Sequence, residues 1–350
     1  MVANTKNFLD CVHCYEDEGI EYIQAAQQYR CSSCYCHWSE LAVEGTHYFP
    51  NGQVDIIIGG HCVPLAKTKL ITKERATMLL SIEGDTSTAK TTFALTAPLP
   101  IVCFAFDIGF DYAIKGLKFK EYFEGLSIHT EKYNRIGENK VDEAYHQNLW
   151  HNNDITIYEL PTPIQLDSNT VSGYIALWQY FISLLGLAAS DSIVSSIVLD
   201  TATIARTVAV NKYLEELNQR GERGRKQLLQ IEYGVPNGAI ENIYSTMAVV
   251  GKVFIATHHM RDEYKDQNVG GKIESVTTGK LELDGWNKTH RFVDVAIETT
   301  KDKGNFKAKY VKCRLNPKLE GGEIIGEPNW NNLVEHIEMT LEGRVKFPRR

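Results

Sequence analysis

One stretch of the sequence combines the residue types that bind phosphate groups. Residues 84–91 read GDTSTAKT, which departs from the pattern G-x-x-x-x-G-K-[ST] only at Ala89, where the second glycine belongs. In that pattern, backbone N–H groups and the start of the following helix form a concave, positively charged phosphate site. Lys90 is expected to reach the β- and γ-phosphates of ATP, and Thr91 to offer its hydroxyl to Mg²⁺. Alanine suits position 89 if the backbone there has φ below zero.

The surroundings of this loop favour a phosphate site over a chance turn rich in Ser, Thr and Gly. The apolar run 77–83 before it predicts a strand, and residues 89–97 after it are compatible with a helix. The predicted nucleotide-binding residues of this segment are Gly84, Asp85, Thr86, Ser87, Thr88, Ala89, Lys90, Thr91 and Thr92.

Polar side chains end three further predicted strands. Asp107 ends the strand at 100–107, Asp200 ends the strand at 195–200, and the pair His258 and His259 ends the strand at 252–259. We expect Asp200 to orient Mg²⁺ or its water, Asp107 to polarise the attacking water, and one histidine to sense the γ-phosphate. Each of these residues also has an explanation that involves no nucleotide. Asp107 could equally cap a turn, many buried strands end in aspartate, and histidine pairs occur at strand ends by chance.

These strands alternate with helices along the chain. Helical spacing is found at 171–189, 203–219, 239–251 and 329–343. Residues 291–300 and 306–315 read as an antiparallel pair joined by a turn. The alternation predicts an α/β fold with a mostly parallel sheet flanked by helices, in which the polar strand ends meet at the carboxyl edge.

The chain resembles a known group of ATPases in the segments SIEGDTSTAKTTFALTAPLPIVCFAFDIG, SIVLDTAT, EYG (232–234) and VFIATHHMRDEY. The group is the phage nucleotide-binding AAA/RecA-like ATPases, which include RecA-like single-strand annealing proteins of bacteriophages. The resemblance covers roughly residues 76–315. It departs from the group's usual pattern at Ala89, in place of glycine, and at Asp107, where RecA-type enzymes usually have glutamate.

The resemblance implies a RecA-like core with Lys90 and Thr91 at the phosphates and magnesium. It also implies Asp200 in the Walker B role, Asp107 as the catalytic acid and His258 or His259 as the sensor. It further implies action on DNA, with single-stranded DNA as a partner, and a homo-oligomer in which a neighbouring cation completes the site. Arg261 and Lys301 are candidates for that cation.

Five of the eight cysteines fall between residues 11 and 36. Cys11 and Cys14 form one CxxC pair, and Cys31 and Cys34 form another after 16 intervening residues, which is the spacing of a four-cysteine Zn²⁺ ribbon. Either Cys36 or His37 could replace Cys34 as a ligand. Because the segment between the pairs is acidic, a structural role or the binding of a replication or recombination protein is at least as well supported as DNA contact.

Two segments are rich in cations. Residues 220–226 read RGERGRK, a glycine-containing loop that could bind a phosphate backbone or be only a solvated loop. Its candidate nucleic-acid contacts are Arg220, Arg223, Arg225 and Lys226. Residues 301–314 interleave Phe306 and Tyr310 with lysines, a pattern better explained by an edge strand protected against aggregation.

The bulk composition bounds these hypotheses. A formal net charge of −7 means that DNA binding would need a local basic site, because the molecule as a whole is not a polycation. Neither a transmembrane span nor a signal peptide is expected, so the chain should lie in a cytoplasm, that of the host cell if it is phage-encoded. We predict a ribbon at 1–45, a connecting segment at 46–75 and an ATPase domain at 76–350.

The expected activity is ATP hydrolysis coupled to DNA annealing, recombination, replication or repair. One alternative is a nucleotide-dependent adaptor or loader with slow turnover, for which Ala89 leaves room. Another is a helicase or packaging motor that shares the same core.

Overall fold

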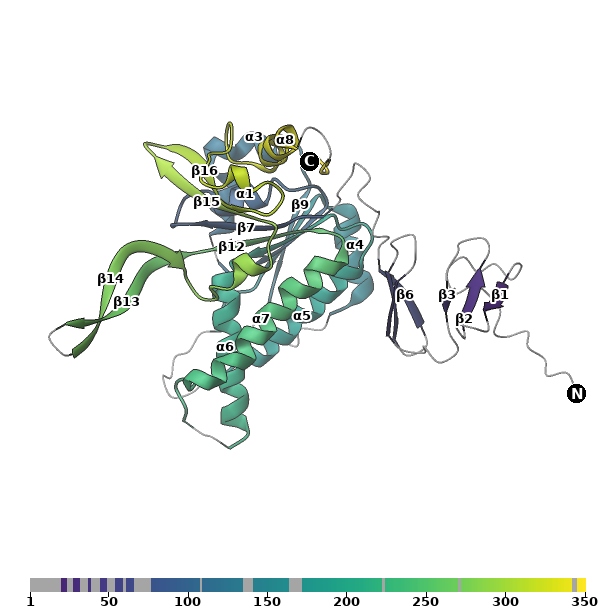
Figure 1. The fold of residues 1–350 in the computed structure, drawn as a ribbon, viewed down its shortest axis with the longest axis horizontal. Coiled ribbons are helices and arrows are strands. Elements are labelled where there is room, and N and C mark those ends of the chain that lie inside the picture. Colours follow the sequence, from purple (N-terminus) through teal and green to yellow (C-terminus); the bar gives the residue numbers. More distant parts are fainter. Residues whose placement is uncertain are drawn as a thin grey trace, which may run out of the picture. The chain divides into compact units, whose positions relative to one another are not determined.

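Figure 1 shows the computed structural model of the chain. It describes residues 77–350 apart from 108, 135–140, 164–171, 222–223, 270–271 and 342–344, and before residue 77 it describes the backbone of six short strands. The chain divides into two units, Met1–Thr72 and Lys73–Arg350. The further division of the first unit at residue 45 stays a prediction.

The described strands of the first unit form two small antiparallel sheets. One contains β1 (Ile20–Ile23), β2 (Gln28–Cys31) and β3 (His37–Trp38), and the other β4 (Gly45–Tyr48), β5 (Val54–Ile58) and β6 (His61–Leu65). Of the predicted Zn²⁺ ligands, Cys11, Cys14, Cys34 and the alternative Cys36 lie outside the described residues. Only the backbone of Cys31 and of His37 is described. The zinc ribbon therefore stays a prediction.

The second unit is built on one eight-stranded sheet in the order β16-β15-β7-β12-β11-β8-β10-β9. All neighbours in it are parallel except β15 and β16. The strands are β7 (Leu79–Gly84), β8 (Ile101–Ala105), β9 (Ile128–Lys132), β10 (Ile155–Glu159), β11 (Ser196–Asp200), β12 (Val253–His258), β15 (Val295–Asp302) and β16 (Asn305–Cys313).

Helices cover both faces of this sheet (Figure 1). On one face lie α5 (Tyr174–Ser190), α6 (Ala202–Gln219) and α7 (Gly234–Val250). On the other lie α1 (Lys90–Ala94) and α8 (Trp330–Thr340). The remaining helices are α2 (Phe110–Lys115), α3 (Lys120–Phe123) and α4 (Glu143–Asn152). The predicted α/β fold, a mostly parallel sheet flanked by helices, is confirmed.

The central strands are buried on both faces, which explains their continuous apolar sequences. Because side chains alternate across a strand, Phe254 and Ala256 of β12 pack toward α5–α7, whereas Val253 and Ile255 pack toward α1 and α8. The same alternation decides which polar residues at the strand ends face the phosphate loop.

Two features of the sheet differ from the expectation. The antiparallel pair at 291–300 and 306–315 exists as β15 and β16, but β15 also joins the main sheet beside β7. A ribbon of β13 (Met260–Val269) and β14 (Lys272–Leu283) leaves the carboxyl end of β12 and projects from the core (Figure 1). Its polar, mixed-charge sequence carries little strand signal, so the periodicity of apolar residues misses it. Among the described helices, none is long and apolar enough to cross a membrane.

Candidate nucleotide-binding site

The predicted phosphate loop connects the carboxyl end of β7 to α1. Gly84 has φ 153°, and a Cβ atom there would lie 2.5 Å from the carbonyl oxygen of Thr299 on β15. No side chain fits that space, so glycine is required at this first position. The Thr88 hydroxyl is 2.9 Å from the Thr299 hydroxyl, and the Thr299 hydroxyl donates to the Glu83 carbonyl at 3.1 Å. The loop is thus fastened to β15 as well as to β7.

Ala89 takes a left-handed conformation, with φ 66° and ψ 24°. The condition that φ is below zero at this position is therefore wrong. A residue with a Cβ atom in this region places that atom too close to the following carbonyl oxygen, at a cost of about 1–2 kcal/mol. The conformation itself explains why the phosphate-loop pattern has glycine at this place.

We expect Ala89→Gly to raise the free energy of unfolding by up to about 1 kcal/mol. Release of the left-handed strain outweighs the extra entropy of glycine in the unfolded chain. Ala89→Val should lower it by about 1–2 kcal/mol, because a β-branched side chain is less compatible still with positive φ. The midpoint of urea unfolding at unchanged slope measures both changes. Ala239→Gly in helix α7 is the matched control and should destabilise, so a loss of stability in Ala89→Gly as well would contradict the assignment.

The Lys90 ammonium lies inside the curve of the loop. Its Nζ donates to the carbonyl oxygens of Gly84 at 2.9 Å and Asp85 at 2.6 Å. Burial lowers the pKa of Lys90, and the nearby carboxylates of Asp200, Asp85 and Asp107 oppose that change. A buried cation whose hydrogen bonds, among the described residues, go to loop carbonyls is well placed to exchange them for phosphate oxygens.

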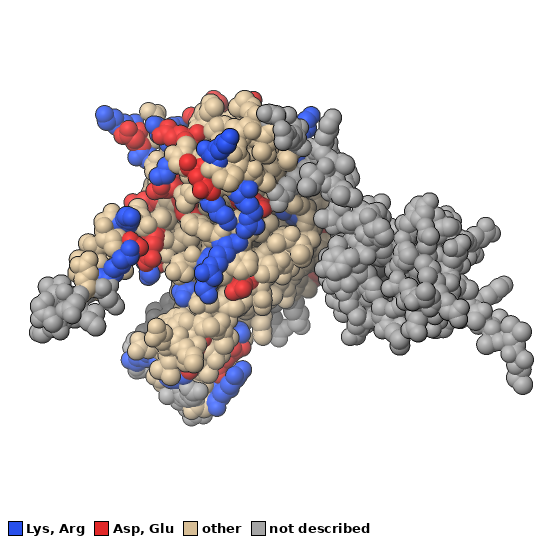
Figure 2. Space-filling model, in the orientation of Figure 1, with Lys and Arg blue, Asp and Glu red and all other residues tan. Residues whose placement is uncertain are grey.

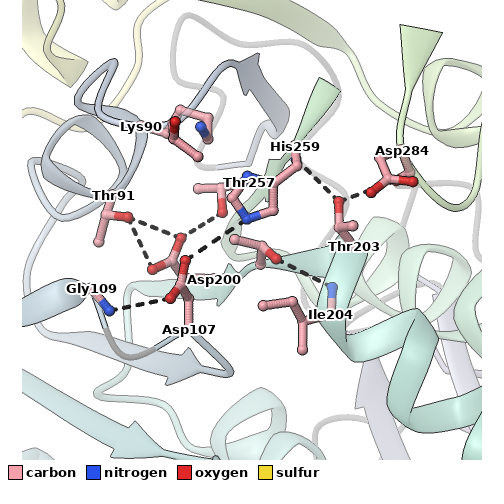
Figure 3. A network of polar contacts seen from close by, with 12 residues as sticks. Lys90, Thr91, Asp107, Gly109, Asp200, Thr203, Ile204, Thr257, His259 and Asp284 are labelled. Carbon is pink, nitrogen blue, oxygen red and sulfur yellow. Dashed lines mark hydrogen bonds and ion pairs between the residues drawn. The ribbon is translucent and has the colours of Figure 1, made fainter. Parts of the chain in front are cut away.

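Asp200 accepts hydrogen bonds from two hydroxyl groups on different elements (Figure 3). Thr91 Oγ1 lies 3.1 Å and 3.0 Å from its two carboxylate oxygens, and Thr257 Oγ1 donates to Oδ1 at 2.5 Å. The side chain is 1% exposed. Burial raises the pKa of Asp200, while the hydrogen bonds from the two threonines and the charge of Lys90 act in the opposite direction.

Asp107 and His259 approach each other beside this group. His259 Nε2 is 3.8 Å from Asp107 Oδ2, and the N–H of Gly109 donates to Asp107 Oδ1 at 3.3 Å. The Asp107 side chain is 39% exposed, so its carboxylate remains accessible to water. The backbone N–H of His259 donates to Thr203 Oγ1 at 3.1 Å, which connects this corner to the start of α6.

His258 is not part of this group. It is 2% exposed, and its Nε2 lies 3.1 Å from the Tyr244 hydroxyl of α7. It therefore lies on the sheet face covered by α5–α7, which also holds Phe254 and Ala256. Burial is the main cause that lowers the pKa of His258 to about 3, so the ring is neutral. Alternation along β12 gives the position facing Asp200 to Thr257 instead. We therefore assign no nucleotide contact to His258.

The remaining loop residues take different positions. Asp85 and Thr86 are exposed, with the Thr86 N–H donating to Asp85 Oδ1 at 2.8 Å. Ser87 has φ 60°, and the Thr92 hydroxyl donates to the Ala113 carbonyl at 3.3 Å, toward α2 and not toward the loop. Sequence reasoning placed Thr257 at the strand end without a role at the site and missed Thr299. The only signal for Thr257 is its place before the histidine pair, and nothing in the sequence pairs Thr299 with Gly84.

The predicted cation loop lies far from this site. Helix α6 begins at Ala202, beside Asp200, and its 18 residues span about 27 Å before the loop starts. Arg225 forms a two-pronged ion pair with Glu232, at 2.9 Å and 2.5 Å, whereas Arg220 and Lys226 are exposed. Arg223 lies outside the described residues. Of the two candidate cations for a neighbouring site, Arg261 pairs with Glu282 at 2.8 Å, and the Lys301 Nζ is 5.4 Å from the centre of the Phe306 ring.

Comparisons with known proteins add little to this geometry. No protein-family model and no curated protein sequence matches the chain. Among solved structures, it is similar to a KaiC-like protein from the hyperthermophilic archaeon Pyrococcus horikoshii, with 13% identity over 72% of this chain and 87% of that chain and a TM-score of 0.32. A likeness this distant says nothing about what the chain binds. The fold assignment depends on the strand order and the site on the contacts described above.

Proposed function

We propose that the chain binds ATP with Mg²⁺ at the carboxyl edge of β7, β12, β11 and β8 and hydrolyses it. The observation that carries the proposal is the pair of contacts from the Thr91 hydroxyl to Asp200, at 3.0 Å and 3.1 Å. The two residues come from separate strand–helix units and meet beside a loop whose backbone and lysine suit phosphate. This is the arrangement by which P-loop ATPases hold a metal-bound triphosphate.

The residues present fit a magnesium ion. Thr91 and Asp200 offer hydroxyl and carboxylate oxygen atoms, the donors that Mg²⁺ prefers, and Mg²⁺ usually keeps several waters beside one or two protein ligands. Burial raises the pKa of Asp200 in spite of the hydrogen bonds from Thr257 and Thr91 and the charge of Lys90, so its charged form would gain from a further cation nearby. When bound, the metal would neutralise charge that develops on the phosphate oxygens.

The surrounding side chains would bind the phosphates and orient the attacking water. Lys90 would exchange its two loop carbonyls for β- and γ-phosphate oxygens. Asp107, accessible and held by the Gly109 N–H, would orient a water for in-line attack on the γ-phosphorus atom. His259 lies 3.8 Å from Asp107 and could hold the carboxylate in place or donate to a γ-phosphate oxygen. The attack releases ADP and inorganic phosphate.

We further propose that hydrolysis is coupled to single-stranded DNA and that the chain works as a homo-oligomer. Support comes from the projecting ribbon, which begins one residue after His259, so that movement at the nucleotide would reach a surface element directly. Annealing or recombination is the leading role, by the resemblance given above. The zinc ribbon would supply a further surface for a partner protein.

The test is steady-state ATP hydrolysis with and without single-stranded DNA and with excess EDTA, beside Thr91→Ala and Thr91→Ser. EDTA should stop turnover. Thr91→Ala should lower kcat about tenfold or more because the hydroxyl to the metal is removed, whereas Thr91→Ser keeps that hydroxyl and most of the activity. Lys115→Ala, an exposed change on α2, is the control for folding and should leave the rate unchanged.

Two results would count against the proposal. Equal rates in Thr91→Ala and the wild type would remove Thr91 from the metal site. ATP binding without turnover, in the presence and absence of DNA, would favour the adaptor or loader over the ATPase.

A further inference from the structure

Four cations gather on the surface beside the base of the β13–β14 ribbon. Lys288 precedes the short 3-10 helix η3 (Thr289–Arg291) and Arg291 ends it, and Lys312 and Arg314 come from the end of β16 and the residue after it. Arg314 Nη2 donates to the Arg291 carbonyl at 2.8 Å, and Lys312 Nζ donates to the His290 and Val293 carbonyls. We call these four residues the η3 strip. Figure 2 shows Lys and Arg side chains in an oblique band across the middle of this face.

The strip carries excess positive charge in a chain whose formal net charge is −7. Two carboxylates lie near its Lys312 and Arg314 end, and Glu83 contacts His290 of η3. Asp294 is buried, accepts the Leu79 N–H and is 4.0 Å from Arg314, and Glu320 accepts the Cys313 N–H. Lys288 and Arg291 are exposed and have no carboxylate partner among the described residues. Burial lowers the pKa of Lys312 and the charge of Arg314 lowers it further, while the charges of Asp294 and Glu320 oppose this change.

An aromatic side chain adjoins the cations. Phe292, next to Arg291, is half-buried and packs against Trp286 and Tyr244, with ring centroids 5.4 Å and 6.3 Å apart. Two exposed cations, with two further cations held by backbone carbonyls beside them and an aromatic ring next to Arg291, suit a chain of phosphates with bases that can stack. An acidic protein segment would use the charges but has no particular use for the ring.

We infer that the η3 strip binds the phosphate backbone of single-stranded nucleic acid. This inference rests on the proposed function, because it supplies the surface that the proposed DNA coupling requires. It differs from the loop at 220–226, which is about 27 Å along α6 from the nucleotide site. Lys312 and Arg314 belong to the cation-rich segment 301–314, whereas Lys288 and Arg291 lie outside both segments that the sequence singled out.

The strip is joined directly to the phosphate loop. His290 lies between Thr289 and Arg291 on η3, and its Nε2 is 2.5 Å from Oε1 of Glu83, the buried residue immediately before Gly84. Thr299, which fastens the loop to β15, donates to the Glu83 carbonyl. A polyanion bound by Arg291 and Lys288 would therefore lie beside His290 and could shift its contact with Glu83, the residue from which the phosphate loop starts.

The experiment measures binding of a fluorescent oligo(dT) to the full chain with a slowly hydrolysed ATP analogue and Mg²⁺ over a range of salt concentrations. Lys288→Ala combined with Arg291→Ala should weaken binding about tenfold near 0.1 M salt. It should also lower the slope of log K against log [salt] by about 0.7 for each phosphate that the strip no longer neutralises. Arg220→Ala combined with Lys226→Ala removes the same charge at the other cation loop and should leave both quantities unchanged.

Each other outcome overturns the inference in a different way. Weakening by the 220/226 pair alone would place the DNA at that loop and leave the proposed function standing. No binding of oligo(dT) by the wild type would remove both the strip and the DNA coupling, while ATP hydrolysis, measured separately, would still decide the nucleotide site. Binding of polyglutamate as tight as that of oligo(dT) would assign the strip to an acidic protein.

Discussion

Replacing Lys90 by methionine is expected to lower kcat for ATP about a thousandfold. The ammonium lies inside the loop, hydrogen-bonded only to the Gly84 and Asp85 carbonyls, and is the one side-chain cation that the structure places within the predicted phosphate loop. Methionine keeps the length of the side chain and removes its charge, so the fall in rate reports on charge at the phosphates and not on packing. Steady-state hydrolysis at saturating ATP measures it.

The same variant separates catalysis from stability. Burial lowers the pKa of Lys90 in the folded chain, so the charged form is disfavoured by folding and stability rises as pH rises through that lowered value. Below it, Lys90→Met removes the desolvation cost and should unfold at an equal or higher urea concentration than the wild type. A fall in both activity and stability would mean that Lys90 is chiefly structural. Unchanged activity would remove it from the nucleotide site.

Much of the fold could be predicted because the signals are local. Continuous apolar runs mark β7, β8, β11 and β12, and the helical spacing of α5, α6, α7 and α8 survives in the structure within a few residues. The β13–β14 ribbon escaped prediction because a projecting ribbon buries no face and so leaves no alternation of apolar and polar residues. β9, with half-buried residues at the sheet edge, is weakly patterned for the same reason.

In the candidate site, too, some residues could be predicted from local sequence signals and others could not. Lys90, Thr91 and Asp200 could be predicted because each is tied to the end of a strand or the start of a helix. His258 and Thr257 could not be told apart, since the choice depends on which face each side chain of β12 takes. The conformation of Ala89 could not be predicted from the sequence either. Alanine occupies the position at which a glycine would have indicated a positive φ.

Lys288 and Arg291 illustrate a third reason why a site can escape prediction from the sequence. They are separated in sequence from Lys312 and Arg314 by most of β15 and β16, and neither pair is a charge run by itself. Only the antiparallel return of β16 along β15 brings the end of β16 beside η3. A surface assembled from two chain segments in this way has no motif that a single sequence could reveal.

Asp107→Asn is expected to lower kcat about a hundredfold while leaving the affinity for ATP within about twofold. The carboxylate is 39% exposed and held by the Gly109 N–H, so it is positioned to accept a hydrogen bond from a water rather than to bind the nucleotide. Asparagine has nearly the same shape and can still accept from Gly109, but it lacks the negative charge that polarises the water. Single-turnover hydrolysis beside equilibrium binding of an ATP analogue separates the two effects.

Asp107→Glu is the informative companion variant. RecA-type enzymes usually have glutamate at or near this point, so a longer carboxylate should retain measurable turnover if position 107 is the water-orienting position. His259→Ala should then lower kcat less than Asp107→Asn does, if His259, at 3.8 Å from Asp107, acts mainly by holding that carboxylate in place. If Asp107→Asn kept the wild-type rate and His259→Ala abolished it, the roles of the two residues would be reversed. His259 would then be the group that acts on the water or the γ-phosphate, and Asp107 the residue that orients it.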